Sequence, residues 1–213
     1  MTALKKNKLL MMLVIIFMLL NNSIIYAFDL ERKISKNVYI GEIDVSDLTI
    51  EEATKKVNLY IEENRYFNLI YNDKKIKIDK NTFDLDYKIP QLAQNAYNVG
   101  RDKDIITNIK TKVSLKRGNK EIIPIVSYYN ISKIDELIKQ LNEQFYISPV
   151  NATAEVINDK VAVTKGSYGQ NINKQQLKSI IIYKIDNLNS KDSEIPITVL
   201  KPKYTSKQLS KID

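Results

Sequence analysis

One order of elements is expected twice along this 213-residue chain, and that repetition constrains the fold more than any single motif. In each copy a helix-forming segment precedes two short strand-forming segments, and a second helix and a further strand follow. The two strand pairs, 67–78 and 152–164, are each joined by an Asn-Asp turn, and these turns lie 86 residues apart. Asn and Asp tolerate positive φ and bond their own backbone, so they suit tight hairpins.

The starts of the first helix in each copy are predicted by the sequences of their first turns. Residues 49–52 and 132–135 have the [ST]-x-x-[DE] spacing of a capping box, and each opens an amphipathic segment with apolar residues at helical spacing. We expect these two helices to start near Ile50 and Lys133 and to pack on the hairpins that follow them. A third capping sequence, at 205–208, predicts another helix start.

The later elements of each copy complete an α+β fold. Helices are expected at 90–99 and 174–188, and strands at 121–127 and 194–200. Both strands contain Ile-Pro-Ile, and because Pro lacks a ladder donor they should be edge strands or strand starts. We therefore predict two tandem helix-plus-antiparallel-hairpin repeats, in which helices cover one face of the sheet.

The repeats define the expected organisation of the chain. The first repeat covers 34–127 and the second covers 128–204. Residues 205–213 are either the start of a further helix, as in the front part of a longer protein, or a frayed C-terminal tail. An N-terminal segment, 1–27, precedes both repeats.

The N-terminal segment predicts export. Three lysines, Lys5, Lys6 and Lys8, precede the apolar run 9–20, and Ala27 is a small residue at a possible cleavage point. Alternatively, the apolar span continues through residues 24–28 and reaches the roughly 20 residues of a membrane-spanning helix. Residues 1–27 are thus a signal peptide or a membrane anchor. Both place the rest outside the cytoplasm, membrane-anchored or secreted to the cell wall.

Missing residue types exclude many functions. The chain has no Cys and no His, which excludes thiol catalysis, Ser-His-Asp triads, disulfides and zinc fingers. Its five glycines fit neither nucleotide-binding loop, so no cofactor is expected. The net charge of +8 is not gathered into a stripe with interleaved aromatics, so nucleic acid is not an expected partner.

No catalytic or metal site is expected. No serine has the S-x-x-K spacing of the serine enzymes that act on cell-wall peptides. The pairs Glu42 with Asp44 and Asp84 with Asp86 lie two apart on expected strands, and we interpret them as solvated strand or turn residues rather than a glycosidase pair. Neither pair has the spacing of a calcium-binding loop. The protein is therefore predicted not to be an enzyme.

Three motifs resemble a known family in the same order along the chain. Residues 39–53, YIGEIDVSDLTIEEA, resemble the opening of the peptidoglycan-binding domain found in VanW-type proteins and some exported L,D-transpeptidases. Residues 96–101 are similar to its Ala-Tyr-x-x-Gly-Arg element, and 149–152 with 166–169 resemble its hairpin and paired-glycine loop. The resemblance covers residues 34–209. Glu42 and Asp47 depart from it, because the family commonly has glycine at these positions.

The resemblance implies a partner, peptidoglycan or another anionic cell-wall polymer, and it directs attention to four candidate ligand residues. Arg101 follows a glycine that we interpret as the C′ cap of the preceding helix, with ligand contact as the alternative. Tyr168 lies between Gly166 and Gly169 in a tight loop, where its ring either stacks on a sugar or belongs to a structural turn.

Two functions remain open at this point. The first is an exported, non-catalytic cell-envelope module that binds peptidoglycan or acts as a spacer. The second is the non-catalytic front part of a VanW-type or L,D-transpeptidase envelope enzyme, ended early. The transpeptidase domain needs a catalytic Cys and a His, and this chain has neither.

The N-terminal segment gives the first testable prediction. Fractionation of cells that produce the full chain should find it in the membrane or the extracellular fraction, since Lys5 to Ala27 has the composition of an export segment. Recovery of the full-length chain in the soluble cytoplasmic fraction would contradict this prediction.

Overall fold

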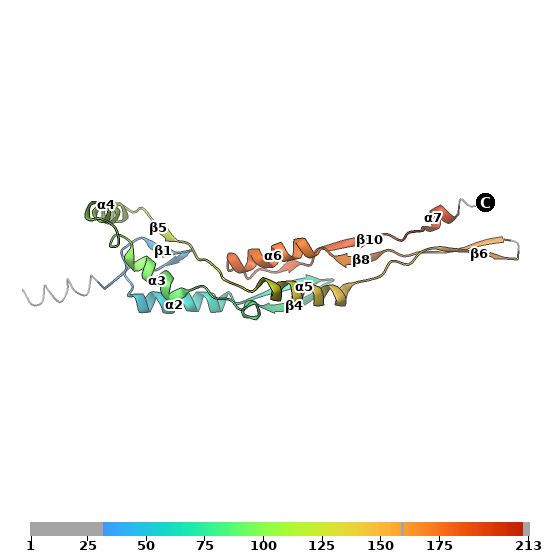
Figure 1. Ribbon diagram of the computed structural model, residues 1–213, viewed down its shortest axis with the longest axis horizontal. Coiled ribbons are helices and arrows are strands. Elements are labelled where there is room, and N and C mark those ends of the chain that lie inside the picture. The colour runs from blue at the N-terminus through green and yellow to red at the C-terminus, as the bar shows by residue number, and fades with distance from the viewer. Residues whose placement is uncertain (1–31, 159, 211–213) are drawn as a thin grey trace, which may run out of the picture. The chain divides into compact units, whose positions relative to one another are not determined.

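The computed structural model describes residues 32–210 except residue 159, and it confirms the α+β class (Figure 1). The predicted signal or anchor at 1–27 lies outside the described residues. Within them, no helix is long and apolar enough to cross a membrane. The described chain divides into two compact units, each made of two chain segments: unit 1 contains 32–60 and 88–125, and unit 2 contains 61–87 and 126–210.

Unit 1 is built on a three-stranded sheet of order β2-β1-β5. Its central strand β1 pairs antiparallel with β2 and parallel with β5, and α3 packs on both β1 and β5. Helix α2 begins in this unit and α4 follows α3. The elements are β1 (Val38–Ile40), β2 (Ile43–Asp44), α2 (Ile50–Glu63), α3 (Ile89–Asn98), α4 (Ile105–Lys116) and β5 (Glu121–Ile123).

The start of α2 confirms the first capping box. The backbone N–H of Thr49 donates to Glu52 Oε2 at 2.8 Å, and the N–H of Glu52 donates to Thr49 Oγ1 at 3.2 Å. Ala53 and Val57 are fully buried on the inner face of the helix, as its apolar spacing predicted. Just before it, Asp47 adopts a left-handed conformation with a φ of 58°, so this position of the resembled family keeps its turn geometry without glycine.

Unit 2 contains a second three-stranded sheet, β4-β3-β9, and the two-stranded pairs β10-β8 and β6-β7. Its elements are β3 (Tyr66–Tyr71), β4 (Lys74–Asp79), the 3-10 helix η1 (Lys80–Phe83), α5 (Ile131–Phe145), β6 (Thr153–Ile157), β7 (Lys160–Thr164), β8 (Gly169–Ile172), α6 (Lys174–Asp186), β9 (Ser193–Glu194), β10 (Ile197–Leu200) and α7 (Ser206–Leu209).

The core of unit 2 joins the first hairpin to the two long helices. Helices α5 and α6 pack against each other, and their apolar faces form one buried cluster with Phe67, Leu69 and Ile78 of the β3–β4 hairpin. The side chains of β6 and β7 are exposed, apart from a partly buried Val163. The expected packing of the second helix on the second hairpin is therefore wrong. The β3–β4 hairpin presents larger apolar side chains to α5 than the Ala and Val residues of β6–β7 could.

Local sequence signals are confirmed at most other boundaries. Asn72 and Asp73 have φ values of 44° and 63°, as a two-residue hairpin turn requires. Strand β5 ends before Pro124, and β10 begins after Pro196. The second capping box is wrong, because α5 starts at Ile131 and the side chain of Asn130 accepts the N–H of Ser132 at 3.1 Å.

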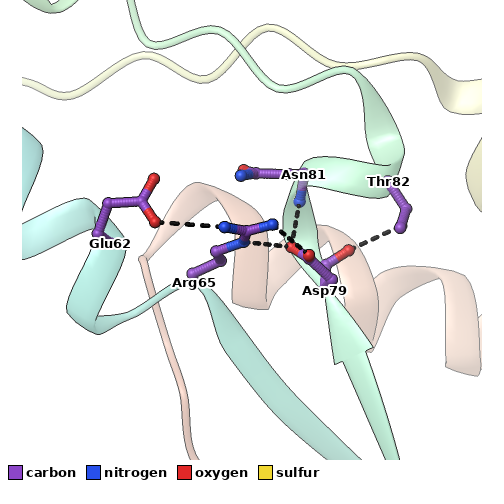
Figure 2. Close-up of polar contacts among 5 residues, drawn as sticks. All are labelled: Glu62, Arg65, Asp79, Asn81 and Thr82. Atoms are coloured by element: carbon purple, nitrogen blue, oxygen red, sulfur yellow. Dashed lines mark hydrogen bonds and ion pairs between the residues drawn. The ribbon is translucent and has the colours of Figure 1, made fainter.

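A polar cluster fixes the start of β3 against the end of β4 (Figure 2). Arg65 donates from Nε to Asp79 Oδ1 at 2.8 Å and from Nη2 to Asp79 Oδ2 at 2.6 Å. The same carboxylate accepts the N–H of Asn81 at 3.0 Å and so caps η1. The Arg65 contact and the cap hold the pKa of Asp79 below its usual value. This planar two-bond pairing favours one register for the hairpin.

Lys80, the first residue of η1, is buried, and its ammonium group is buried with the rest of the side chain. Its Nζ donates to the carbonyl oxygen of Asn64 at 2.7 Å, and only 1% of the residue is exposed. Burial, with a smaller contribution from the charge of Lys184, lowers the pKa of Lys80 to about 8. The folded state is therefore less stable when Lys80 is protonated than when Lys80 is neutral.

This burial gives a pH prediction. The unfolded chain binds the Lys80 proton more tightly than the folded chain, so the free energy of unfolding should rise from about pH 8 toward the ordinary lysine pKa of 10.5. Burial raises the pKa of Tyr87 to about 12, which acts in the opposite direction only at higher pH. Lys80→Met should reduce the rise, leaving the part due to Lys184, whose pKa burial also lowers, and should add about 1–3 kcal/mol near neutral pH. Urea denaturation followed by circular dichroism measures both, and the exposed Lys74→Met is the control.

Candidate functional site

Unit 1 carries a hollow of about 220 Å³ that we call the basic hollow. Its cations come from three separate stretches of the chain: the segment before β1, the residue after the α3 cap, and the last two turns of α4. Leu115 is buried at the hollow. The lining residues are Lys33, Ile34, Ser35, Lys36, Asp47, Arg101, Lys112, Leu115 and Lys116.

Arg101 connects the walls of the basic hollow. Gly100 has a φ of 73° just after the C-cap Val99, which is the C′ position where a residue without Cβ is favoured. The turned chain lets Arg101 donate from Nη1 to the Tyr97 carbonyl at 2.5 Å and from Nη2 to the Lys33 carbonyl at 2.7 Å. Its guanidinium also lies 4.4 Å from the centre of the Tyr97 ring. Arg101 therefore holds the N-terminal wall against the end of α3.

Within the part of the chain that the structure describes, three of the remaining cations of the basic hollow have no ion-pair partner. Among the described residues, Lys36, Lys112 and Lys116 form no ion pair, and Asp47 is the one carboxylate in the lining. Unpaired cations gathered in a concave surface attract anions more strongly than the same charges spread apart. The geometry therefore suits a carboxylate or phosphate ligand.

A second hollow, of about 560 Å³, lies beside the basic hollow and shares Arg101 and Lys112 with it. Its other lining residues are Tyr97, Gly100, Ile105, Asn108 and Ile109. The sequence predicted Arg101 as a candidate but not the lysines around it. Helix α4 was not predicted, and no local sequence pattern indicates that Lys36 and Lys116 are neighbours.

The other candidate residues lie in unit 2. Tyr168 is 60% exposed and has no hydrogen-bond or ring partner among the described residues, so its ring is available to a ligand. Gly169 faces the opposite segment so closely that a Cβ would lie 2.2 Å from the Ile147 carbonyl oxygen. At Gly166 a Cβ would lie 2.7 Å from the backbone of Val150. Close backbone approach therefore explains both glycines.

Asp44 and Asp84, one from each candidate carboxylate pair, have structural partners. Asp44 accepts the N–H of Ser46 at 2.9 Å, and contacts with Ser46 lower its pKa. Asp84 binds Lys133 Nζ at 2.6 Å, which lowers the pKa of its carboxyl. A general acid needs a raised pKa, and neither carboxyl has one. In the part of the chain that the structure describes, no cluster of acidic, His or Cys side chains could hold a metal ion.

The contact at Gly169 gives a stability prediction. Gly169→Ala should lower the free energy of unfolding by about 1–3 kcal/mol, because the added methyl overlaps the opposite backbone. Ser167→Ala, in the same exposed segment, should change it little. Chemical denaturation of the two variants measures the difference. Equal free energies of unfolding would contradict the prediction and show that β8 can move away from the Ile147 backbone with little loss of stability.

Comparison with known proteins identifies the family. A family profile described as "Putative peptidoglycan binding domain" matches residues 76–194, more than half of the chain. The matched region includes Arg101, the α4 wall of the basic hollow and the loop of Tyr168. No curated protein and no solved structure matches the chain. The length of the profile match shows that the chain belongs to the putative peptidoglycan binding domain family.

Proposed function

We propose that the protein is an exported, non-catalytic module of the cell envelope that binds peptidoglycan through the basic hollow of unit 1. The observation that carries the proposal is the family match over residues 76–194, which indicates a role in binding the cell wall. The hollow supplies cations suited to the carboxylates of peptidoglycan stem peptides. The motifs at 39–53 and 96–101 favour the branch of the family associated with VanW-type proteins and L,D-transpeptidases.

The expected affinity of one site is low. Exposed ion pairs contribute at most about 1 kcal/mol each, so a few of them support millimolar binding, on the order of 4 kcal/mol. Peptidoglycan presents the same groups repeatedly along its strands, and a protein anchored or exported beside it meets a high local concentration of sites. Weak single contacts are therefore compatible with retention on the wall.

Binding without catalysis agrees with the residues present. Nucleophilic attack on a wall peptide needs an activated Cys, Ser or comparable group, and the chain has no Cys, no His and no S-x-x-K. Of the carboxyls considered for acid catalysis, Asp44 and Asp84 have hydrogen-bond or ion-pair partners. The proposed role is thus to hold the protein, or a partner, at a position along the wall.

Sedimentation with insoluble cell wall tests the proposal. The full-length protein should co-sediment with purified peptidoglycan at low salt and leave its muropeptide profile unchanged. Lys33→Gln with Lys36→Gln should weaken retention about twofold to thirtyfold, because it removes two cations from the hollow. The matched control removes two exposed cations of unit 2, Lys174→Gln with Lys207→Gln, and should bind as the unchanged chain does.

The outcomes separate the candidate sites. Loss of retention at high salt supports the charge-based site, since exposed charges are screened. If Tyr168→Ala weakens retention and the Lys33/Lys36 pair does not, ring stacking in unit 2 replaces the basic hollow as the binding site. Absence of sedimentation at low salt would remove the binding proposal, and new cross-links or cleaved glycan would overturn the non-catalytic one.

A further inference from the structure

Helix α4 is turned so that its apolar residues face the solvent. Leu115 is its one buried residue, and the inner side is otherwise formed by the partly buried Thr107, Asn108, Thr111 and Ser114. The opposite side exposes four large apolar residues: Ile105 is 78% exposed, Ile106 66%, Ile109 57% and Val113 41%. We call these four residues the α4 stripe.

The spacing of the α4 stripe makes it one continuous surface. Ile105, Ile109 and Val113 follow one another every four residues, so they stand one above the next, and Ile106 widens the row at its first turn. Nothing in unit 1 covers this row, although a helix of a soluble domain normally buries such a face. An exposed apolar patch with polar edges commonly marks an interaction surface.

Cations border the α4 stripe on both sides. Lys110 lies at one edge and Lys112 at the other, and Lys116 lies on the stripe face at its C-terminal end; all three are exposed. Arg117 follows at the helix end. The only acidic residue at the helix, Asp104, caps the first turn by accepting the Thr107 N–H at 3.0 Å. Long basic side chains beside an apolar row can cover it with their stems and extend their charged ends toward anionic headgroups.

The position of unit 1 in the chain agrees with this surface. Its described residues begin at Arg32, four positions after the apolar sequence that ends at Phe28. The unit also has a net positive charge: its two segments, 32–60 and 88–125, contain thirteen Lys and Arg and eight Asp and Glu. A cationic surface complements anionic lipid headgroups, and each basic residue near such a surface adds to the attraction.

We propose that the α4 stripe docks on the anionic lipid surface of the membrane, with the side chains of Ile105, Ile106, Ile109 and Val113 in the interface and the bordering lysines at the headgroups. Unit 1 then lies against the membrane. Lys112 and Lys116 border both this surface and the basic hollow, so the two proposals are separated by their test variants: Lys33 and Lys36 of the hollow are not on α4.

A single label on α4 tests the docking in the full chain. Because the chain has no Cys, Ile109→Cys gives one attachment point for a polarity-sensitive fluorophore. The labelled protein is reconstituted in phosphatidylcholine vesicles, with or without about 30% phosphatidylglycerol. Val156→Cys, on the exposed face of β6, is the matched control at a residue that is 74% exposed.

The expected result is a blue shift of the emission and quenching by spin-labelled lipid, for Ile109→Cys only, and stronger with phosphatidylglycerol. Raising the salt to about 0.5 M should reduce both effects, since the headgroup attraction is screened. Lys110→Gln with Arg117→Gln should reduce them too, while the circular dichroism spectrum stays unchanged.

Three results would overturn the proposal. The first is equal, solvent-like emission at both labelled positions in both vesicles. The second is a blue shift in detergent solution that grows with protein concentration, which would assign the stripe to a second copy of the chain. The third is a concentration-independent shift without lipid, which would mean that another part of the same chain covers it.

Discussion

The burial of the β3–β4 hairpin under helices α5 and α6 is the constraint on which unit 2 depends. Phe67 and Leu69 from the first half of the chain share one core with Ile134 and Ile181 from the second half. Full burial of each such side chain contributes about 1.5–3 kcal/mol. The chain leaves unit 2 after residue 87 and returns to it at residue 126. Residues 88–125, between these two points, join residues 32–60 in unit 1.

The basic hollow of unit 1 depends on the same discontinuity. Arg101 belongs to the inserted segment, and its two hydrogen bonds reach the Tyr97 and Lys33 carbonyls. Those bonds use the guanidinium as a structural element and leave the lysines around it unpaired. The concave, cationic surface therefore arises from an arginine that organises the walls and lysines that remain available to an anion.

Helix α4 shows why an apolar pattern does not by itself define a core. Its sequence alternates isoleucines with small polar residues and lysines, and the fold places the small polar residues inward. Unit 1 thereby presents two different surfaces close together, a charged hollow at the end of α4 and an apolar row along its outer side. If one unit carries both the proposed wall-binding site and the proposed membrane-facing helix, it would set the distance between the bilayer and the bound peptidoglycan.

The sequence by itself determined many of the local elements and the family, although not helix α4 or the cap of α5. The Asn72-Asp73 turn, the Thr49 capping box and the strand breaks at Pro124 and Pro196 were predictable because each depends on residues within a few positions of one another. Tertiary structure alone decided which hairpin is buried, that Asn130 rather than Ser132 caps α5, and that Lys33, Arg101 and Lys116 border one hollow. These features depend on packing between distant segments, where side-chain volume and competing hydrogen bonds decide among arrangements that local sequence permits equally.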